Sequence, residues 1–503
     1  MDSAQKLKLR TLGQLRASGY KPKSIKDEMR ENLMNALRMR KPVFSGIKGY
    51  EDTVMPQIET AILSKHNILL LGLRGQAKTK LARLMVNLLD EYIPVVKGSE
   101  INDDPLNPIS IFAKELIKNH GEDTPIEWMH RNERYTEKLA TPDVSVSDLI
   151  GDVDPIKAAN QKLTYADERV IHFGLIPRSH RCIFVINELP DLQPRIQVAL
   201  FNILQEGDVQ IRGFKFRLPL DVKFIFTANP EDYTKRGSII TPLKDRIDSQ
   251  ILTHYPKTIE ISQAITEQEA QIAGEQKSCI YVHNLIKTVT ERISFMARES
   301  EYVDQKSGVS ARMTISAYET LYSTAERRML IHNKKKSFVR FSDIYGVVPS
   351  ITGKIELVYE GETEGIANVA SYLIGRAFRH EFEKIFPNPE KIKKSKQLNP
   401  YQSIIAWFNE GHHTDILSNS TDEEYAASLR QVPGLEDYVK KIFPTASATD
   451  TLLYMEFLLH GLSEFSQISK QVIEKGIQFK DLLGSLLGGH SHEDGDDELY
   501  RDN

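Results

Sequence analysis

One short segment, residues 69–85, constrains the fold of this chain more than any other: LLLGLRGQAKTKLARLM. Its apolar run ends at Gly72, and Lys78 and Thr79 follow at the spacing of the phosphate-binding pattern G-x-x-x-x-G-K-[ST]. A loop of this kind surrounds phosphate groups with backbone N–H groups, so it needs small residues where it approaches them. The segment therefore predicts a buried strand, a phosphate-binding loop and an amphipathic helix, whose inward-facing residues are Leu81, Leu84, Met85 and Leu88.

The loop departs from the pattern at one position, because Ala77 stands where the pattern has its second glycine. One added methyl group is tolerable if this residue lies at the start of the helix with φ below zero. We expect the Lys78 amine to reach the β- and γ-phosphates of a nucleotide and the Thr79 hydroxyl to bind Mg²⁺. The predicted cofactors are thus ATP and Mg²⁺, and the predicted nucleotide-binding residues are Gly72, Gly75, Gln76, Ala77, Lys78, Thr79 and Lys80.

A second apolar run, CIFVI, ends in Asn187 and Glu188. Hydrolysis of ATP on a phosphate loop needs an acidic pair at such a strand end: an Asp that holds Mg²⁺ through water, and a Glu that polarises the attacking water. Glu188 is therefore the candidate base. Asn187 replaces the Asp and can bind the waters of Mg²⁺, but it brings no negative charge. Weakening such an outer-shell partner often costs about 10–100-fold in metal affinity or activity, so slow turnover is expected.

Three further polar residues follow at positions suited to catalysis. Asn229 ends the apolar run VKFIFTA, where a polar side chain can orient the attacking water. Arg246 ends a predicted short helix, from which it can reach the nucleotide of a neighbouring subunit and stabilise transition-state charge. Arg312 stands at the start of the helical stretch ARMTISAYETL, where a lid arginine can touch the γ-phosphate. Taken alone, an arginine such as Arg246 is more often part of a surface ion pair.

The chain divides into segments of different pattern. Residues 43–255 alternate strand-like and helical stretches, which indicates an α/β fold with a mostly parallel sheet. Continuous apolar runs predict buried strands at Ile68–Leu71, Cys182–Ile186 and Val222–Thr227. We expect the other segments to be an N-terminal helical arm (1–42), a β-hairpin within the α/β domain (205–224), a helical lid that contains Arg312 (256–352), a mostly helical C-terminal extension (353–488) and a disordered acidic tail (489–503).

Composition excludes several classes of protein. Hydrophobic residues make up 40% of the 503 residues and charged residues 27%, an ordinary globular balance with a net charge of −4. This charge gives no electrostatic footprint for general nucleic-acid binding. Cys182 and Cys279 lie far apart in no metal-ligand spacing, which fits a reducing compartment. The N-terminus lacks an apolar leader, and no run approaches the ~20 apolar residues of a membrane span. We therefore expect a cytoplasmic protein.

The order of these motifs resembles that of the AAA+ ATPases, and more narrowly the clade of the MoxR ATPases and the ATPase subunit (subunit I) of magnesium chelatase. The resemblance covers roughly residues 43–330. The loop GLRGQAKT is similar to the MoxR-type loop, in which alanine also precedes the lysine. The segments that resemble chelatase or this clade are GSEINDDPLNP (98–108), FGLIPRSHR (173–181), LKDRI (243–247) and QEGDVQIRGFKFRLPLDVKF (205–224), the last as a hairpin before sensor 1 with Gly213 at its tip.

The resemblance implies roles for the candidate residues. It makes Gly75, Lys78 and Thr79 phosphate ligands and Glu188 the Walker B glutamate, and it makes Asn229 sensor 1, Arg246 the arginine finger and Arg312 sensor 2. Such proteins assemble as ring hexamers with ATP between subunits, and relatives often act with a partner that carries a von Willebrand A domain. They use ATP to remodel or activate a protein, including by metal insertion. The region after residue 353 has no counterpart in the chelatase subunit, so we expect it to dock a partner or stabilise the ring.

The main hypothesis is thus an ATP-hydrolysing ring ATPase of the MoxR and chelatase type, acting as a chaperone on an unnamed protein. The first alternative is a genuine magnesium chelatase ATPase subunit. The second is a nucleotide switch that barely hydrolyses ATP because of Asn187; a large rate gain in Asn187→Asp would favour it. The third is a DNA-dependent relative that touches phosphates with hairpin residues Arg212, Lys215 and Arg217, although three basic residues on a hairpin are more often a solvated face.

Overall fold

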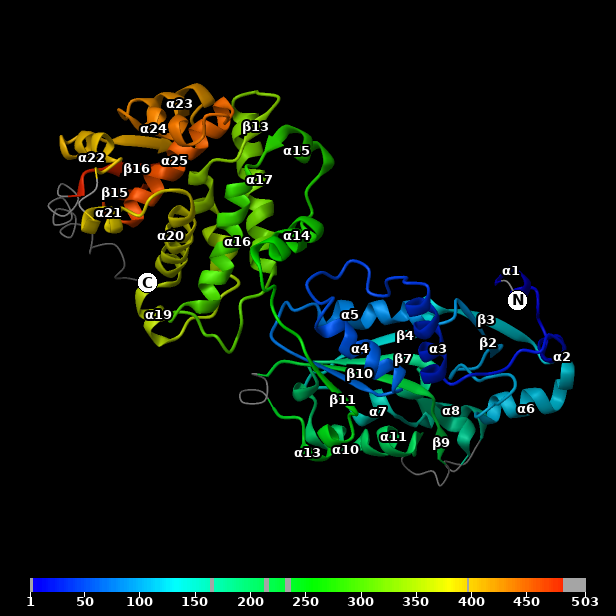
Figure 1. The fold of residues 1–503 in the computed structure, drawn as a ribbon. Helices are drawn as coiled ribbons and strands as arrows, with labels where there is room; N and C mark the ends of the chain where they lie inside the picture. The colour runs from blue at the N-terminus through cyan, green and yellow to red at the C-terminus, as the bar shows by residue number, and fades with distance from the viewer. Residues whose placement is uncertain (1–2, 163–166, 212–216, 231–236, 396–397, 483–503) are drawn as a thin grey trace. The chain divides into compact units, whose positions relative to one another are not determined.

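The computed structural model describes residues 3–162, 167–211, 217–230, 237–395 and 398–482 (Figure 1). The chain separates into two compact units, Met1–Tyr255 and Pro256–Asn503. The first unit is α/β and the second is mostly helical. Among the described residues, no helix combines the length and the apolar character that crossing a membrane requires.

The first unit is built on a parallel sheet. Among its described residues, five strands pair in the order β11-β1-β10-β7-β4, and every pair is parallel. The three strands expected from continuous apolar runs are confirmed, because β1, β7 and β10 are buried along their whole length, as strands covered on both faces must be. The strands are β1 (Ile68–Leu71), β4 (Tyr135–Leu139), β7 (Cys182–Asn187), β10 (Val222–Ala228) and β11 (Ser249–Leu252).

Alternate residues of each strand enter two different cores, because successive side chains point to opposite faces of a sheet. Ile68 and Leu70 pack in one core and Leu69 and Leu71 in the other. Figure 1 shows the corresponding helical layers on the two faces of the sheet. The first core receives residues from α3 (Ile25–Arg38), α4 (Val54–Leu63) and α5 (Lys78–Leu84), and the second from α7 (Val146–Leu149), α10 (Pro194–Ala199), α11 (Phe201–Glu206) and α13 (Thr241–Asp245).

Helix α3 belongs to the body of the first unit. Ser24 caps its start by accepting a hydrogen bond from the Asp27 N–H at 3.1 Å. Ile25, Met29 and Leu33 are buried against the sheet. The segment expected to be an N-terminal arm therefore places its longest helix in the core of the α/β unit.

The remaining elements of the first unit are short. The hairpin expected at 205–224 has its base in an antiparallel pair of two-residue strands, while Gly213 at its predicted tip lies outside the described residues. The other helices are α1 (Ser3–Lys6), α2 (Leu12–Ala17), α6 (Ile111–His120), α8 (Pro155–Gln161) and α9 (Leu175–Arg178), and the antiparallel pairs are β2 (Tyr92–Val96) with β3 (Ile126–His130), β5 (Gly151–Val153) with β6 (Ile171–Phe173) and β8 (Asp208–Val209) with β9 (Leu218–Pro219).

The second unit has one continuous hydrophobic core that runs from Ile280 to Phe479. Residues from both segments expected to be helical, before and after position 353, enter this core. Its helices are α14 (Ile259–Glu269), α15 (Gly274–Cys279), α16 (Asn284–Glu299), α17 (Arg312–Ile331), α18 (Val348–Thr352), α19 (Tyr359–Glu364), α20 (Ile366–Ile385), α21 (Pro389–Ser395), α22 (Gln402–Asn409), α23 (Asp422–Arg430), α24 (Leu435–Ile442) and α25 (Ala448–Glu464).

Two small sheets complete the second unit. The strands β12 (Ile280–Tyr281) and β13 (Ser337–Phe338) pair in parallel. An antiparallel sheet in the order β14-β16-β15 is an addition to the helical pattern read from the sequence. Its strands are β14 (Thr414–Leu417), β15 (Ser469–Ile473) and β16 (Gly476–Lys480).

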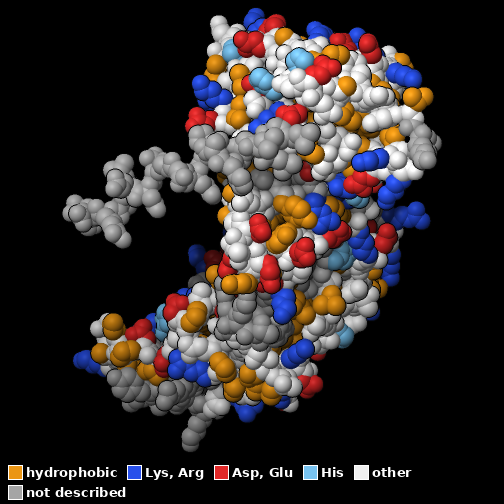
Figure 2. Space-filling view, turned by 90° about the vertical axis from the view of Figure 1, so that its left-hand side faces the viewer, with side chains coloured by type: hydrophobic (Ala, Val, Ile, Leu, Met, Phe, Trp, Pro, Cys, Tyr) orange, Lys and Arg blue, Asp and Glu red, His pale blue; other side chains and the backbone are white. Residues whose placement is uncertain are grey.

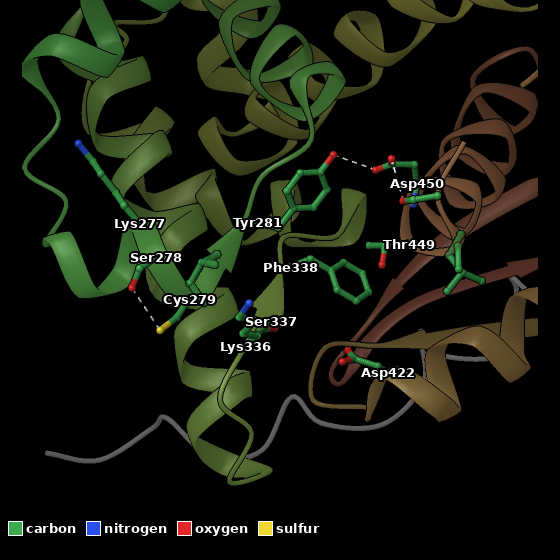
Figure 3. A pocket seen from close by; sticks show the side chains of 14 residues that line it. Lys277, Ser278, Cys279, Tyr281, Lys336, Ser337, Phe338, Asp422, Thr449 and Asp450 are labelled. Atoms are coloured by element: carbon green, nitrogen blue, oxygen red, sulfur yellow. Dashed lines mark hydrogen bonds between the residues drawn. The ribbon is translucent and has the colours of Figure 1, made fainter. Parts of the chain in front are cut away.

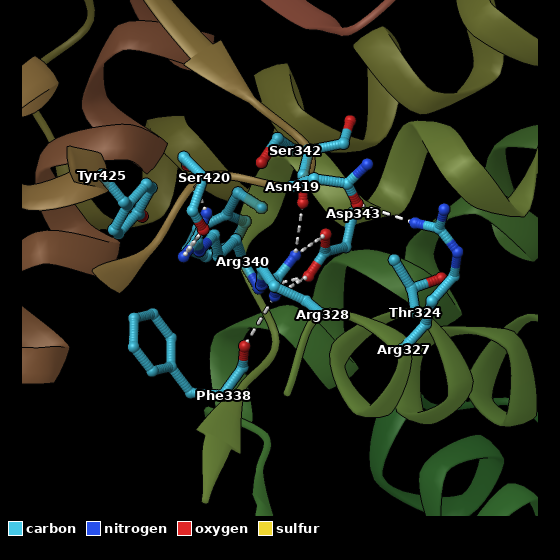
Figure 4. Close-up of polar contacts among 12 residues, drawn as sticks. Thr324, Arg327, Arg328, Phe338, Arg340, Ser342, Asp343, Asn419, Ser420 and Tyr425 are labelled. Atoms are coloured by element: carbon cyan, nitrogen blue, oxygen red, sulfur yellow. Dashed lines mark hydrogen bonds and ion pairs between the residues drawn. The ribbon is translucent and has the colours of Figure 1, made fainter. Parts of the chain in front are cut away.

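A buried ionic cluster joins α17 to the segments around it (Figure 4). Arg328 and Asp343 are almost fully buried, and the guanidinium of Arg328 donates two hydrogen bonds to the carboxylate, at 2.7 and 2.8 Å. The backbone N–H of Arg340 donates to the same carboxylate at 2.8 Å. The Arg340 guanidinium in turn lies 4.3 Å from the centroid of the Tyr425 ring. The charged ends of Arg328 and Asp343 thus neutralise each other inside the core, as buried charges require.

The first unit also buries a lysine. Lys223 in β10 is 1% exposed, and its amine donates to the carbonyl oxygen of His66. Burial lowers the pKa of Lys223 from its ordinary value of 10.5 to about 7, an effect strengthened by Lys26 and opposed by Asp248. Between these two pKa values the unfolded chain binds a proton that the folded chain does not, so this lysine makes the protein less stable as the pH falls towards 7.

Lys223→Met is therefore expected to raise the free energy of unfolding of the first unit, and to raise it more at pH 7 than at pH 9. The difference between the two gains is expected to be roughly 2 kcal/mol, because the penalty on Lys223 weakens over those two pH units. Urea unfolding followed by Trp128 fluorescence in a Trp407→Phe background measures it. Lys97→Met, at an exposed position, is the control. A gain of equal size at both pH values would contradict the prediction.

Candidate functional site

The predicted site residues of the first unit gather at one edge of the sheet. The strands β1, β7 and β10 are parallel, so their carboxyl ends lie at the same edge. The loop 72–77 follows β1, Asn187 and Glu188 stand at the end of β7, and Asn229 follows β10. In open α/β sheets ligands bind outside this edge, where the strand order reverses. The strand order reverses at β1, because this strand lies between β10 and β11 in the sheet.

Lys78 occupies the centre of this edge. It begins α5 and is 7% exposed. Its amine donates to the carbonyl oxygens of Gly72 and of Leu73, the latter at 3.0 Å, and to Oδ1 of Asn229 at 3.0 Å. Two residues separated by about 150 positions in the sequence are thus in direct contact. All three acceptors of the amine are oxygen atoms, and the oxygen atoms of a phosphate group can take their place.

The loop is tied to neighbouring segments on its other side. The Tyr50 hydroxyl lies 2.9 Å from the carbonyl oxygen of Gln76 and 2.8 Å from that of His254, and burial raises the pKa of Tyr50 to about 12. The Tyr255 hydroxyl donates to the carbonyl oxygen of Arg74 at 2.8 Å. The Thr253 hydroxyl donates to Oε1 of Gln76 at 2.6 Å. These bonds fix the carbonyl side of the loop.

Gly72 is required at its position by close packing. A Cβ atom there would lie 2.1 Å from the Thr253 hydroxyl oxygen and 2.2 Å from Oε1 of Gln76. Any side chain at position 72 would therefore separate the loop from the segment that holds it.

Ala77 does not meet the condition under which alanine would be tolerable at this position. Its φ is 56° and its ψ 20°, the left-handed region, rather than the negative φ that would make alanine harmless. An L-residue in this region has its Cβ close to a carbonyl oxygen, which costs roughly 1–2 kcal/mol. Gly75, at φ 73°, takes the left-handed region without this cost. The loop thus needs a glycine-like backbone at position 77 and has alanine there.

Ala77→Gly is therefore expected to raise the free energy of unfolding of the first unit by about 0.5–1 kcal/mol, the relief of the left-handed strain less the greater entropy of glycine in the unfolded chain. Urea unfolding followed by Trp128 in the Trp407→Phe background measures this change. Ala82→Gly in the same helix is the matched control and is expected to lose about 1 kcal/mol or more. Equal losses in both variants would show that the backbone at position 77 stores no strain.

The side-chain amide of Asn187 is hydrogen-bonded on both sides. Its Nδ2 donates to Oε1 of Glu137 at 2.5 Å, and its Oδ1 accepts a hydrogen bond from the Thr227 hydroxyl at 2.9 Å. The same Thr227 oxygen accepts the backbone N–H of Glu188 at 3.2 Å. Glu188 has φ 53°, so the backbone leaves the extended conformation of β7 at this residue. Thr227 therefore links the ends of β7 and β10.

Glu137 and Thr227 are the functional candidates that sequence reasoning missed. Glu137 lies on β4, the outermost strand of the sheet beside β7, and pairs in register with Val185. Its second oxygen, Oε2, accepts from Arg83 at 2.9 Å and from the Tyr135 hydroxyl at 3.1 Å. The sequence holds a weak signal for it, because the stretch YTEKL precedes the second strand of the site. The partner strand and its register are visible only in the fold.

The arginine candidates stand on other elements than the strand ends. The Arg246 guanidinium donates to Oε1 of Gln205 at 3.0 Å and to the carbonyl oxygen of Pro242 at 2.8 Å, and it lies 4.9 Å from the centroid of the Phe201 ring. Arg312 begins α17 in the second unit. The roles of Arg246 as finger and of Arg312 as sensor 2 remain predictions.

The basic residues of the hairpin are only partly described. Arg217 forms an ion pair with Asp208 across the hairpin base, at 3.3 Å. Arg212 and Lys215 lie outside the described residues. On the face drawn in Figure 2, Lys and Arg side chains are interspersed with Asp and Glu side chains.

The residues at the sheet edge fit Mg²⁺ and a triphosphate. The side chains of Thr79, Asn187, Glu137 and Glu188 supply hydroxyl, amide and carboxylate oxygens, the hard ligands that Mg²⁺ and its waters prefer. Lys78 supplies a buried ammonium, and the lack of a side chain at Gly72 lets the loop pack closely against Thr253.

The comparison with known families agrees with this geometry. Residues 126–247 match the AAA domain of the dynein-related subfamily. The chain contains an AAA domain. The matched residues include Glu137, Asn187, Glu188, Asn229 and Arg246. Together with the five-stranded parallel sheet, this match establishes the α/β P-loop AAA+ fold expected from the sequence.

Solved structures that align with the AAA domain chain are distant. A complex of the magnesium chelatase subunits BchI and BchD aligns at 18% identity over 64% of this chain and 98% of that one, with a TM-score of 0.33. NtrX from Brucella abortus aligns at 14% identity over 57% of this chain and 54% of its own, with a TM-score of 0.32. Hsp104 with ATPγS and casein aligns at 13% identity over 62% of this chain and 50% of its own, with a TM-score of 0.37.

The alignments therefore span about half the length of the NtrX and Hsp104 chains. The fold assignment rests on the matched AAA domain and on the strand order of this chain.

A pocket of about 720 Å³ is lined entirely by residues of the second unit (Figure 3). It opens between the β12–β13 pair and the start of α25. Its lining mixes Lys277 and Lys336 with Asp422 and Asp450, and Asp450 accepts a hydrogen bond from the Tyr281 hydroxyl at 2.9 Å. None of the site residues expected from the sequence lines this pocket.

Proposed function

We propose that this chain binds Mg²⁺ and ATP at the loop 72–79 and hydrolyses the ATP, as a subunit of an AAA+ ring. The observation that supports this most is the contact of the Lys78 amine with Oδ1 of Asn229, at 3.0 Å. Asn229 lies within the residues that match the AAA domain, as do Asn187 and Glu188 on the neighbouring strand end, and the contact joins them to the loop that follows β1.

Each residue has a task in this proposal. Lys78 exchanges its contacts with the carbonyl oxygens of Gly72 and Leu73 for phosphate oxygens. Glu188 accepts a proton from the attacking water, and Asn229 orients that water. Bound Mg²⁺ supplies positive charge that neutralises the phosphate oxygens, with Thr79 and Asn187 as the residues beside it.

The ring is proposed because Arg246 lies on the surface of the first unit, where a neighbouring subunit can present its nucleotide. A finger supplied in trans raises kcat by about 10³–10⁵-fold in other nucleotide hydrolases. We infer a hexamer that remodels or activates a partner protein in the cytoplasm, with a von Willebrand A domain protein as the expected partner. A genuine magnesium chelatase ATPase subunit is the alternative within the same class.

The test is steady-state ATP hydrolysis by the full chain across a concentration series, with Lys78→Ala and Arg246→Ala. The proposal predicts a specific activity that rises with protein concentration and is lost in both variants. Arg217→Ala, which removes an exposed ion pair of the same unit, is the control and is expected to keep the activity. Hydrolysis that persists in Lys78→Ala would refute the assigned site.

A nucleotide switch is the second candidate. It is favoured by Asn187, whose amide oxygen and nitrogen are both occupied by Thr227 and Glu137. Tight ATP binding without hydrolysis at any concentration would support this candidate against the motor.

A further inference from the structure

The carboxylate of Glu137 lies beside Asn187, the position at which an Asp is usual in the acidic pair. Oε1 of Glu137 is 2.5 Å from Nδ2 of Asn187. The Thr227 hydroxyl donates to the opposite side of the same amide, at 2.9 Å, so the two partners together fix which side carries the nitrogen. The amide therefore points its donor at Glu137.

The three side chains share one face of the sheet. Paired residues of parallel strands point to the same face, and residues two apart on one strand do so too. Glu137 pairs with Val185, two residues before Asn187, and Thr227 pairs with Leu70. Val185 and Leu70 both pack in the core beneath α3, α4 and α5. Glu137, Asn187 and Thr227 thus lie on the face covered by the helix that follows the phosphate loop.

That helix brings the predicted metal ligand to the same place. Thr79 and Arg83 are four residues apart on α5 and so share one side of the helix. Arg83 already contacts Glu137, with its Nη2 at 2.9 Å from Oε2. The Arg83 side chain is 64% exposed, so water screens this pair and it contributes little to stability.

We propose that Glu137 is the carboxylate that balances Mg²⁺ in this site, as a positioning residue that acts through the Asn187 amide. The negative charge usually carried by the strand-end Asp is then supplied from the neighbouring strand β4. This inference rests on the proposed function, because it assumes that Mg²⁺ and ATP bind at the loop.

The arrangement changes what Asn187→Asp should do. An Asp at position 187 would place a second carboxylate within hydrogen-bond distance of Glu137, and two such anions repel each other. Restoring the usual Asp alone should therefore not tighten metal binding at the site. The double variant Glu137→Gln with Asn187→Asp exchanges the two groups and keeps one carboxylate and one amide in contact. It should therefore recover the metal binding that Glu137→Gln alone loses.

The test measures metal binding rather than turnover. The full chain is saturated with AMP-PNP, a hydrolysis-resistant ATP analogue, and the dissociation constant of Mn²⁺, a visible substitute for Mg²⁺, is measured by electron paramagnetic resonance. Glu137→Gln is expected to weaken Mn²⁺ binding by about 10–100-fold, the usual effect of losing an outer-shell partner. Asn187→Asp is expected not to tighten it, and the double variant to recover most of the loss. An unchanged constant in Glu137→Gln with a tenfold gain in Asn187→Asp would overturn the proposal.

A structural role for Glu137 predicts a different result. If Glu137 served only to hold α5 through Arg83, then Arg83→Met would weaken Mn²⁺ binding as much as Glu137→Gln does. The positioning role predicts that Arg83→Met leaves Mn²⁺ binding equal or tighter. Equal losses in the two variants, with no recovery in the double exchange, would refute it.

Lys78→Ala separates this inference from the function on which it rests. If the wild-type chain binds AMP-PNP with Mn²⁺ no better than Lys78→Ala, the proposed function fails and the role of Glu137 fails with it. If Lys78→Ala loses binding while Glu137→Gln keeps the wild-type Mn²⁺ constant, the proposed function stands and only the role of Glu137 is refuted.

Discussion

Glu188→Gln is expected to lower the rate of ATP hydrolysis by about 10²–10⁴-fold, the usual contribution of a general base, while ATP binding is retained. Glu188 leaves the end of β7 through a left-handed turn, and its backbone N–H is fixed by the Thr227 hydroxyl at 3.2 Å. Glutamine keeps the shape of the side chain and removes its capacity to accept a proton. The loop and Lys78 are untouched, so the nucleotide should still bind.

Single-turnover hydrolysis and equilibrium binding of a fluorescent ATP analogue measure the two effects separately. Glu115→Gln, at an exposed position of α6, is the control and should change neither. Glu137→Gln provides a contrast, because it is expected to act on metal affinity. A Glu188→Gln variant that hydrolyses ATP at the wild-type rate would remove Glu188 from the mechanism.

Asp343→Ala is expected to lower the free energy of unfolding of the second unit by about 3–5 kcal/mol, the cost of leaving one partner of a buried ion pair unpaired. The Arg328 side chain is 3% exposed and that of Asp343 2%, so water cannot replace the lost carboxylate. The same carboxylate accepts the Arg340 backbone N–H, so the substitution also leaves a buried donor unsatisfied (Figure 4).

The two tryptophans of the chain make this change measurable in the intact protein, because Trp128 lies in the first unit and Trp407 in the second. Trp407 stacks on His412 with 4.9 Å between ring centroids, so its fluorescence reports the packing of the second unit. Urea unfolding is followed by Trp407 in a Trp128→Phe background. Glu423→Ala breaks an exposed ion pair with Lys334 and is expected to cost at most about 1 kcal/mol. Equal effects of the two substitutions would contradict the prediction.

The sequence predicts the central strands and the phosphate loop because these depend on local pattern. A continuous apolar run that stops at a glycine leaves little choice for Ile68–Leu71, and the strand is found there. The same logic places Asn187 and Asn229 at strand ends. Parallel pairing then brings these strand ends together, and only the relative order of the strands had to come from the fold.

Other features depend on contacts that no local pattern contains. The contact of Glu137 with Asn187 depends on the register of β4 against β7, since a shift by one residue would turn Glu137 to the opposite face of the sheet. The left-handed backbone of Ala77 is imposed by the loop as a whole, against the preference of alanine. Lys223 interrupts an apolar strand, and its burial follows from the helices that cover that face.

The small sheet of the second unit escaped prediction for a related reason. Its strand Thr414–Leu417 pairs with Gly476–Lys480, about sixty positions later, across a helical stretch. Short strands with distant partners carry little signal of their own, because their stability comes from cross-strand contacts.

The hydroxyl of Tyr50 touches two carbonyl oxygens at once, that of Gln76 in the phosphate loop and that of His254 at the end of the first unit. A hydroxyl has one proton, so the two carbonyl groups compete for it. The hydrogen bond to the phosphate loop and the hydrogen bond to His254 therefore weaken each other, so the Tyr50 hydroxyl ties the position of the loop to that of the backbone at His254.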